Sequence, residues 1–274
     1  MRKHRRAPRV RLHHRAGALL VAVLAALAGC TGGGSDGAGA GGPSAGTARS
    51  SGEAGGELVV LAAASLSEVV EELAAAVEAA HPSVEVTLSF GGSADLVAQV
   101  LAGAPADVLM TADETTMTRA EDDGAVTAPV VVAENSPVLV VPTGNPAGVT
   151  GLDDLDGAAL VVCAPLVPCG TAAAELARRN GVTLAPVSEE SAVTDVLGKV
   201  TSGQADAGVV YATDARRAGG AVDVVDVPGS TDVLNRYPAA AVIGGDAELA
   251  ALWLDAVTGE PGRTVLADAG FTLP

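Results

Sequence analysis

The sequence predicts an α/β protein of two lobes, each with a mostly parallel sheet flanked by helices. Short apolar runs rich in β-formers alternate with segments of helical periodicity in both halves of the chain. Two apolar segments link the halves, and four small turns stand where a strand gives way to a helix. Residues 57–274 are enough for two lobes of about 100 residues each.

The first half reads strand–helix–strand–helix–strand, the pattern of a parallel sheet with helices on its faces. Ser65 opens the first helix, and Glu68 three residues later gives the pattern of a capping box. His81-Pro82 ends that helix. Ser93 opens the second helix after a pair of glycines. The strands are predicted at 57–63, 84–90 and 106–111.

The second half repeats the alternation without any visible sequence repeat. Segments 130–132 and 138–141 are expected to cross towards a second lobe, and 222–227 to form a strand that is part of the return. Trp253 is expected to be a packing residue in the first of two closing helices. The other strands are predicted at 160–163 and 207–211, and the helices at 172–179, 193–200, 247–258 and 261–269.

The N-terminal region has the pattern of an export signal. A cationic start without acids precedes an apolar stretch at 16–28, which is too short to span a membrane permanently. Cys30 follows Leu27-Ala28-Gly29, an arrangement that resembles the bacterial lipobox, in which the cysteine is lipid-modified. We expect a lipoprotein signal peptide at 1–29 and a lipidated Cys30 with a flexible Gly/Ser/Ala tether at 30–56. An ordinary cleaved signal with an incidental cysteine is the alternative.

The charge balance argues against a nucleic-acid partner. The chain has 16 basic and 33 acidic residues, a net charge of −17. Because seven basic and no acidic residues lie within 1–29, the remainder carries −24. Nucleic-acid binding needs a basic face. Any bound anion must therefore be held by local dipoles against the field of the whole protein.

Two cysteines remain once Cys30 is assigned to the lipid. Cys163 and Cys169 are separated by five residues in a chain expected to reach an oxidising compartment, so a short disulfide loop is predicted. Two reduced thiols are the alternative. A two-cysteine metal site is less favoured, because His81 is the one histidine outside the signal.

Four strand-to-helix turns carry the strongest functional signal. They lie at Ser65, Ser93, 169–171 and 191–193. The first N–H groups of a helix have no intrahelical partner and carry the positive end of its dipole, so each turn is a natural anion site. In open α/β sheets such turns gather at the carboxyl ends of the strands, where ligands bind. Tyr211 ends a strand at the same edge.

No catalytic constellation accompanies these turns. A Ser–His–acid triad would have to use His81, which stands at a helix end before a proline, and no nucleophile elbow is present. Asp107, Asp113, Asp206 and Asp214 follow or precede strands, where acids are usually solvated or serve as caps. Each serine taken alone is more often a plain N-cap, but two at neighbouring junctions favour a shared ligand.

Six stretches stand in the order in which they occur in one known family. They are Ala62-Ala63-Ala64-Ser65-Leu66, Phe90-Gly91-Gly92-Ser93, Gly103-Ala104-Pro105-Ala106-Asp107-Val108, Val167-Pro168-Cys169-Gly170, Gly208-Val209-Val210-Tyr211 and Gly270-Phe271-Thr272. Over 57–274 the chain resembles the molybdate-binding proteins of bacterial ABC importers. The first three stretches together carry most of the specificity.

The resemblance implies a type II periplasmic-binding-protein fold with a two-strand hinge. Lobe 1 would cover 57–137 and 228–274, and lobe 2 would cover 138–227. One molybdate or tungstate would lie in the cleft, without a cofactor or a separate metal. Its ligands would be the hydroxyls and N–H groups of Ser65 and Ser93, the N–H groups of Cys169 and Val193, and the phenol of Tyr211. Cys169 stands where a small residue such as alanine is usual.

The resemblance also implies a cellular location and a role in transport. The protein would be a monomeric binding protein and not an enzyme, anchored by its lipid at the outer face of a bacterial membrane, on the cell surface or in the periplasm. It would deliver its ligand to a permease with an ATPase. The alternatives are another oxyanion such as sulfate or thiosulfate, a ferric ion, a hydrolase with Ser65 as nucleophile, and a sensor on the same fold.

Overall fold

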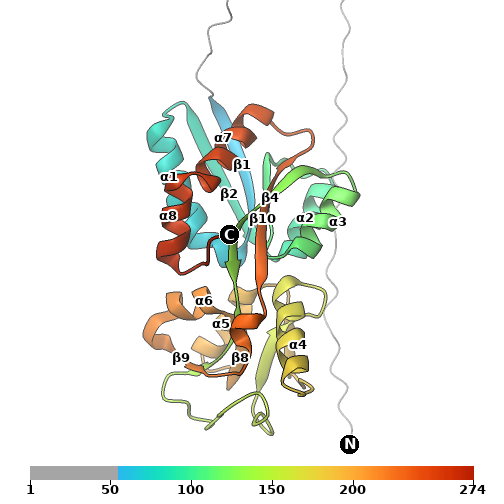
Figure 1. Ribbon diagram of the computed structural model, residues 1–274, viewed down its shortest axis with the longest axis vertical. Helices are drawn as coiled ribbons and strands as arrows, with labels where there is room; N and C mark the ends of the chain where they lie inside the picture. Colours follow the sequence, from blue (N-terminus) through green and yellow to red (C-terminus); the bar gives the residue numbers. More distant parts are fainter. Residues whose placement is uncertain (1–54) are drawn as a thin grey trace, which may run out of the picture. The chain divides into compact units, whose positions relative to one another are not determined.

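Two five-stranded sheets, each covered by helices, make up the computed structural model, which describes residues 55–274 (Figure 1). The predicted signal peptide, Cys30 and all but the last two residues of the predicted tether lie outside the described residues. Within 55–274, none of the helices combines the length and the apolar character needed to cross a bilayer.

The first sheet has the strand order β2-β1-β3-β10-β4. Alternate residues of β1 face opposite sides: Leu58 and Val60 pack towards α1, α7 and α8, whereas Leu61 packs towards α2 and α3. Its strands are β1 (Gly56–Ala63), β2 (Val84–Gly91), β3 (Val108–Met110), β4 (Val126–Asn135) and β10 (Asn235–Val242), and its helices are α1 (Ser67–Ala80), α2 (Ser93–Leu101), α3 (Glu114–Asp122), α7 (Ala247–Thr258) and α8 (Glu260–Ala269).

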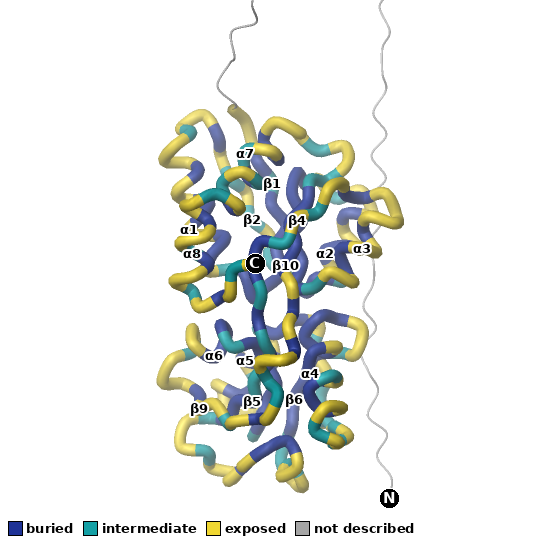
Figure 2. The backbone as a smooth tube through the Cα atoms, in the orientation of Figure 1, coloured by how far each residue is buried: buried dark blue, intermediate teal, exposed yellow. Residues whose placement is uncertain are grey.

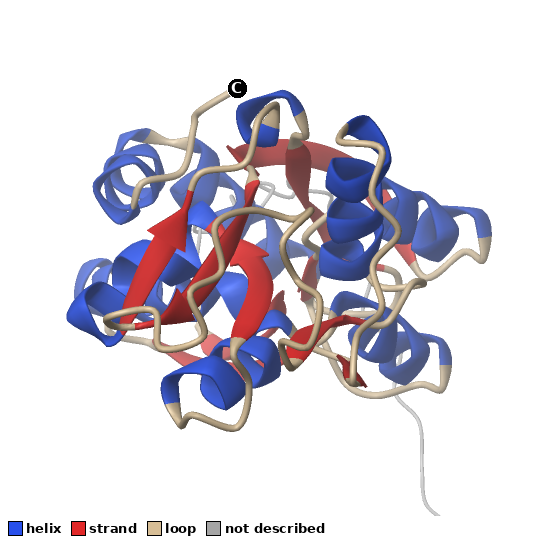
Figure 3. Cartoon of the chain, turned by 90° about the horizontal axis from the view of Figure 1, so that it is seen from below, coloured by secondary structure: helices blue, strands red, loops and turns tan. Residues whose placement is uncertain are grey.

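The second sheet has the strand order β7-β6-β8-β5-β9. Its strands are β5 (Pro137–Pro142), β6 (Leu160–Cys163), β7 (Ser188–Glu190), β8 (Ala207–Tyr211) and β9 (Val222–Val225), and its helices are α4 (Pro168–Arg179), α5 (Val193–Thr201) and α6 (Ala212–Ala218). Three short 3₁₀ turns complete the described chain: η1 (Ala64–Leu66), η2 (Gly219–Ala221) and η3 (Ser230–Asp232). Figure 3 shows the helices around the two groups of strands.

The α/β class is confirmed, and the sheets are more mixed than expected. In each sheet two strand pairings are parallel and two are antiparallel. The antiparallel pairings all involve β5 or β10. Both β5 and β10 start at the junction between the two sheets, because the chain enters each from the other sheet. Their neighbours β3 and β8 end at that junction. A strand that starts at the junction is therefore antiparallel to neighbours that end there.

The chain crosses between the sheets twice. Only Ser136 separates β4 from β5, and the return runs from β9 through 226–234 into β10. The strand predicted at 222–227 is confirmed as β9, but its expected place in the return was wrong for 222–225, because β9 is an edge strand of the second sheet. The returning strand, β10, was not predicted. Its sequence contains Pro238 and three alanines, which have low strand propensity, so packing decides its conformation.

The core confirms the helical periodicity of the sequence. The inner face of α1 buries Val69, Val70, Leu73 and Val77, and its outer face is exposed (Figure 2). Trp253 on α7 is fully buried, as expected for a packing residue, and its Nε1 donates to Met110 Sδ at 3.4 Å. The sequence reasoning missed α3, α6 and β7, which are short elements.

Asp107 ties the first sheet together from a buried position, 8% exposed, and is not a solvated acid. Its Oδ2 accepts from the Val59 N–H at 2.7 Å, and its Oδ1 accepts from the Asp246 N–H at 2.7 Å. Asp206 has the corresponding place before β8, where its Oδ2 accepts from the Ala159 N–H at 2.8 Å. Both carboxylates therefore satisfy backbone donors of neighbouring elements.

We expect Asp107→Ala to destabilise the protein more than Asp206→Ala. The first change leaves two N–H groups without their acceptor and the second leaves one, so the free energy of unfolding should fall by about 2–4 and about 1–2 kcal/mol, respectively. Urea denaturation of the two variants beside the unmodified chain measures the difference. Equal losses, or a larger loss for Asp206→Ala, would contradict the assignment.

Candidate functional site

All five residues predicted to bind a ligand line one small cavity between the two sheets. Ser65 and Ser93 come from the first lobe, and Cys169, Val193 and Tyr211 come from the second. Their exposed fractions lie between 1% and 9%. The cavity measures ≈ 20 Å³, which suits a single small ion and leaves no room for an extended solute such as a sugar or a peptide.

Each lining residue stands at the carboxyl end of a strand. η1 follows β1, α2 follows β2, α4 follows β6, α5 follows β7, and Tyr211 is the last residue of β8. The first N–H groups of a helix have no intrahelical acceptor. In α4 Pro168 occupies the first position and has no N–H, so Cys169 supplies the leading donor. The Gly170 and Thr171 N–H groups both donate to Val167 O at 3.0 Å.

Neither serine caps its helix, which corrects the capping-box prediction. Ser65 lies within η1, and α1 begins at Ser67 with no side-chain cap. Ser93 is the first residue of α2, and Gly92 is its N-cap. The Ser65 Oγ instead is hydrogen-bonded to Tyr237 Oη at 3.3 Å, and the Ser93 Oγ accepts from the Ala112 N–H at 3.0 Å. Both hydroxyls are thus oriented by groups outside their own helices.

Tyr211 is fully buried at the base of the cavity (1% exposed). Its ring packs edge-on against that of Tyr237, with centroids 5.8 Å apart. Burial, and then the nearby Tyr237, Asp113 and Asp214, raise the pKa of the Tyr211 phenol well above its ordinary value. The phenol therefore stays protonated and can donate a hydrogen bond.

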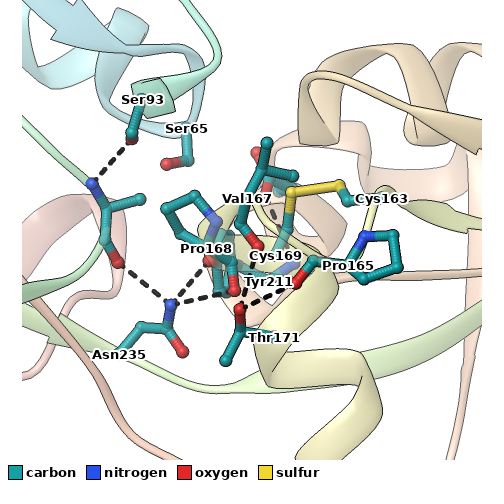
Figure 4. The surroundings of a disulfide bond; sticks show 12 residues. Ser65, Ser93, Cys163, Pro165, Val167, Pro168, Cys169, Thr171, Tyr211 and Asn235 are labelled. Carbon is teal, nitrogen blue, oxygen red and sulfur yellow. Dashed lines mark hydrogen bonds between the residues drawn. A yellow bond between two sulfur atoms is a disulfide. The ribbon is translucent and has the colours of Figure 1, made fainter. Parts of the chain in front are cut away.

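Asn235 is a site residue that the sequence reasoning missed. Its Nδ2 donates to Tyr211 Oη at 2.8 Å, to Ala112 O at 3.0 Å and to Pro168 O at 3.4 Å (Figure 4). It is the first residue of β10, the strand that was not predicted. A lone asparagine in an unrecognised strand leaves no local signal, since its partners are far away along the chain.

No charged residue lines the cavity. One acid close to Tyr211 is Asp214, whose carboxylate accepts from the Tyr211 N–H at 3.2 Å and pairs with Arg217 at 3.0 Å. Burial raises the pKa of Asp214 to about 6, and Arg217 opposes that shift. The lining presents backbone and hydroxyl groups, so any charge held there is stabilised by dipoles.

The two lobes touch at the rim of the cavity. A Cβ added to Gly92 would lie 2.1 Å from Ser191 O, so that position tolerates no side chain. On the other side of the junction, Arg217 Nη1 on α6 donates to Ser67 Oγ on α1 at 3.0 Å. The arrangement is that of a closed cleft.

A disulfide joins Cys163 at the end of β6 to Cys169 in the first turn of α4 (Figure 4). The Cα atoms are 5.6 Å apart. Gly170 packs directly on this loop, because a Cβ there would lie 1.9 Å from Ala164 O. The Thr171 hydroxyl adds contacts at 3.3 Å to Pro165 O and Val167 O. The loop that presents the Cys169 N–H is thereby held at several points.

The described residues contain no cluster of three or more His, Cys, Asp or Glu side chains that could hold a metal ion. His81 caps the far end of α1 and is not among the residues that line the cavity. Ser65 therefore has no histidine base beside it. The geometry suits the capture of a small anion and not nucleophilic catalysis.

The sequence matches the family model described as bacterial extracellular solute-binding protein over residues 58–272. It is 40% identical over 222 residues to the molybdate-binding protein ModA of Mycobacterium tuberculosis H37Rv, covering 79% of this chain and 85% of that protein. It is 30% identical over 231 residues to ModA of Escherichia coli K12, covering 80% and 90%.

Solved structures share the fold. The periplasmic molybdate-binding protein of Azotobacter vinelandii matches with a TM-score of 0.66 and 21% identity, covering 79% of this chain and 99% of that one. The sulfate-binding protein SubI of Mycobacterium tuberculosis matches with a TM-score of 0.64 and 24% identity, covering 79% and 86%. The two-lobe type II periplasmic-binding-protein fold is thus confirmed, and these relatives are binding proteins and not enzymes. The chain belongs to the bacterial extracellular solute-binding proteins.

Proposed function

We propose that this protein captures a fully deprotonated tetrahedral oxyanion, molybdate and also tungstate, and delivers it to the permease of an ABC transporter with its ATPase. One observation carries the proposal: five buried residues from both lobes surround a small cavity that has no charged lining residue. The ligands would be Ser65, Ser93, Cys169, Val193 and Tyr211. The 40% identical relative that is named for molybdate supports this choice of ion.

The donor set favours an anion without a proton. Molybdate at neutral pH has acceptor oxygens only, and the hydroxyls and first-turn N–H groups around the cavity match it. Hydrogen phosphate would require an acceptor such as a carboxylate, and the lining contains none. Hydrogen bonds to an ion contribute about 1.5–3 kcal/mol each, so several together give tight binding.

Sulfate is the second candidate, because SubI, which is named for sulfate, shares the fold with a TM-score of 0.64. Sulfate is likewise a bare dianion and is smaller than molybdate. Charge therefore cannot separate the two ions, and the size of the closed cavity must do so.

Closure of the lobes would convert binding into a transport signal. We propose lobe 1 as 57–137 with 228–274 and lobe 2 as 138–227, hinged where the chain crosses at Ser136 and along 226–234. An ion that contacts donors of both lobes stabilises the closed form relative to an open one. A permease can then recognise the loaded, monomeric protein by its closed surface.

Titration of the purified full chain with four oxyanions tests the ligand. We expect one-to-one binding of molybdate and tungstate by calorimetry and no heat from sulfate or phosphate, because the donors suit a proton-free ion and the 40% identical relative is named for molybdate. Binding of sulfate in preference to molybdate would move the proposal to the second candidate. Silence with all four would refute it.

Loss of the two serine hydroxyls provides the residue-level check. The double change Ser65→Ala and Ser93→Ala removes two donors and should weaken molybdate binding by about 10²–10⁴-fold, at about 1.5–3 kcal/mol for each bond. Ser202→Ala, a change at an exposed position just after α5 and outside the residues that line the cavity, is the control and should bind nearly as the unmodified chain does. Near-normal affinity of the double variant would refute these ligand assignments.

The disulfide should support both stability and affinity. Replacing Cys163 by Ser and Cys169 by Ala opens a loop of seven residues, which by loop entropy should cost about 2 kcal/mol of unfolding free energy. The affinity for molybdate should fall as well, because the Cys169 N–H is then less preorganised. Thermal melting and titration measure the two effects. An unchanged melting temperature and affinity would remove any role for the bridge.

Lipid anchoring through Cys30 is the remaining part of the proposal. Cys30→Ala should leave the chain out of the membrane fraction, since a cysteine after a lipobox-like sequence is the site of modification. Fractionation of cells that express the two forms measures this. A variant that remains membrane-bound would exclude Cys30 as the anchor.

A further inference from the structure

One side-chain amide joins the donors of both lobes. Asn235 is 7% exposed and lies where the chain returns to the first sheet. Its Nδ2 contacts an acceptor of the first lobe, Ala112 O, and two of the second, Tyr211 Oη and Pro168 O (Figure 4). None of these three contacts is local in sequence, and the two to Tyr211 and Pro168 form only when the lobes stand in their closed arrangement.

From Asn235 the contacts continue to three of the five proposed ligands. Tyr211 is reached directly. Ser93 is reached through a single residue, because Ala112 accepts from Asn235 with its carbonyl and donates its N–H to Ser93 Oγ at 3.0 Å. Cys169 is reached through one peptide group, because the carbonyl of Pro168 and the N–H of Cys169 belong to the same amide.

The direction of these bonds determines what the cavity presents. A hydroxyl has one hydrogen and two acceptor lone pairs. Because the Ala112 N–H donates to Ser93 Oγ, that hydroxyl keeps its own hydrogen available for another acceptor. The Asn235 amide likewise donates to Tyr211 Oη, so the phenol hydrogen is left to be shared between Tyr237 and a ligand. The Pro168–Cys169 peptide is trans, so a donor held on its carbonyl leaves its N–H directed the opposite way.

We propose that Asn235 is a positioning residue for the oxyanion site: it orients Tyr211 and the Cys169 N–H only when the lobes are closed, and it supports Ser93 through Ala112 within the first lobe. The inference rests on the proposed function and adds a specificity determinant that does not touch the ion. It explains how a lining without charges offers donors alone.

Asn135 is the matched control that the chain offers. It pairs with Asn235 across β4 and β10, is 4% exposed, and its Nδ2 donates across the lobes to Thr213 Oγ1 at 2.7 Å. The same Nδ2 lies 3.5 Å from Tyr237 Oη, and Asn135 Oδ1 accepts from the Ser136 N–H at 3.0 Å. It therefore reproduces the burial and the hinge position of Asn235 and has different partners.

The test compares Asn235→Ala, Asn235→Asp and Asn135→Ala in the full chain by titration with molybdate from about pH 5.5 to about pH 8.5. Both Asn235 variants should lose on the order of 10- to 100-fold in affinity at the upper pH, and Asn135→Ala should lose less. Asp214, with a pKa of about 6, titrates in this range in every form, so Asn235→Ala supplies the reference profile. Relative to it, Asn235→Asp should regain affinity as the pH falls, because burial beside two carbonyls raises the carboxyl pKa and its protonated form is again a donor.

A double-mutant cycle with Tyr211→Phe tests the coupling between Asn235 and Tyr211 even if an Asn235 variant is less stable. Phenylalanine retains the ring packing and removes the acceptor, so Asn235→Ala should cost less affinity in the Tyr211→Phe background than in the unmodified chain. Circular dichroism and melting temperature report folding separately. Additive effects in the cycle would overturn the proposal.

The other possible results of these titrations also support or overturn the proposed role of Asn235. Equal losses for the Asn235→Ala and Asn135→Ala variants, with the same pH profile for Asn235→Ala and Asn235→Asp, would reduce Asn235 to an ordinary hinge contact and overturn the inference alone. Absence of oxyanion binding by the unmodified chain would overturn the proposed function, and this inference with it. Loss confined to the Asn235 variants, with recovery by Asn235→Asp at low pH, supports it.

Discussion

Unsatisfied backbone donors at the starts of helices are the constraint on which this structure depends. The first N–H groups of η1, α2, α4 and α5 have no acceptor within their own helices, and all four starts meet in one buried place. Burying such groups without partners is costly. The topology therefore gathers N–H donors between the two lobes, and a bound anion stabilises the site by accepting their hydrogen bonds.

Neutral donors also resolve the conflict between an acidic protein and an anionic ligand. The chain carries a net charge of −17, yet its cavity is lined by serines, small apolar residues and one tyrosine. Dipoles at close range act on the ion, while the distant carboxylates are screened by solvent. The acids near Tyr211 have other partners: Asp113 accepts from the Thr116 N–H, and Asp214 pairs with Arg217.

Small residues permit the close approach of the lobes. Gly92 meets the backbone of Ser191 where no Cβ would fit, and Gly170 meets the backbone of Ala164 beside the disulfide. Both glycines act sterically: because they lack a Cβ, the first turn of a helix can approach another backbone segment closely. Asn235 then links the two sides by hydrogen bonds. Shape and polarity are thus set by different residues of the same cleft.

The sequence by itself determined the elements with strong periodicity and the residues that mark their ends. The apolar spacing of α1, the glycines before Ser93 and the strand that ends at Tyr211 are local signals, so the α/β class and the turns that line the cavity followed from them, whereas the resemblance to a known family selected the five ligand residues within those turns. Only the tertiary structure decided the direction of β10, the hydrogen bonds of the Ser65 and Ser93 hydroxyls to groups outside their own helices, and the contact of Asn235 with Tyr211. These depend on partners more than fifteen positions away, and no local pattern encodes such contacts.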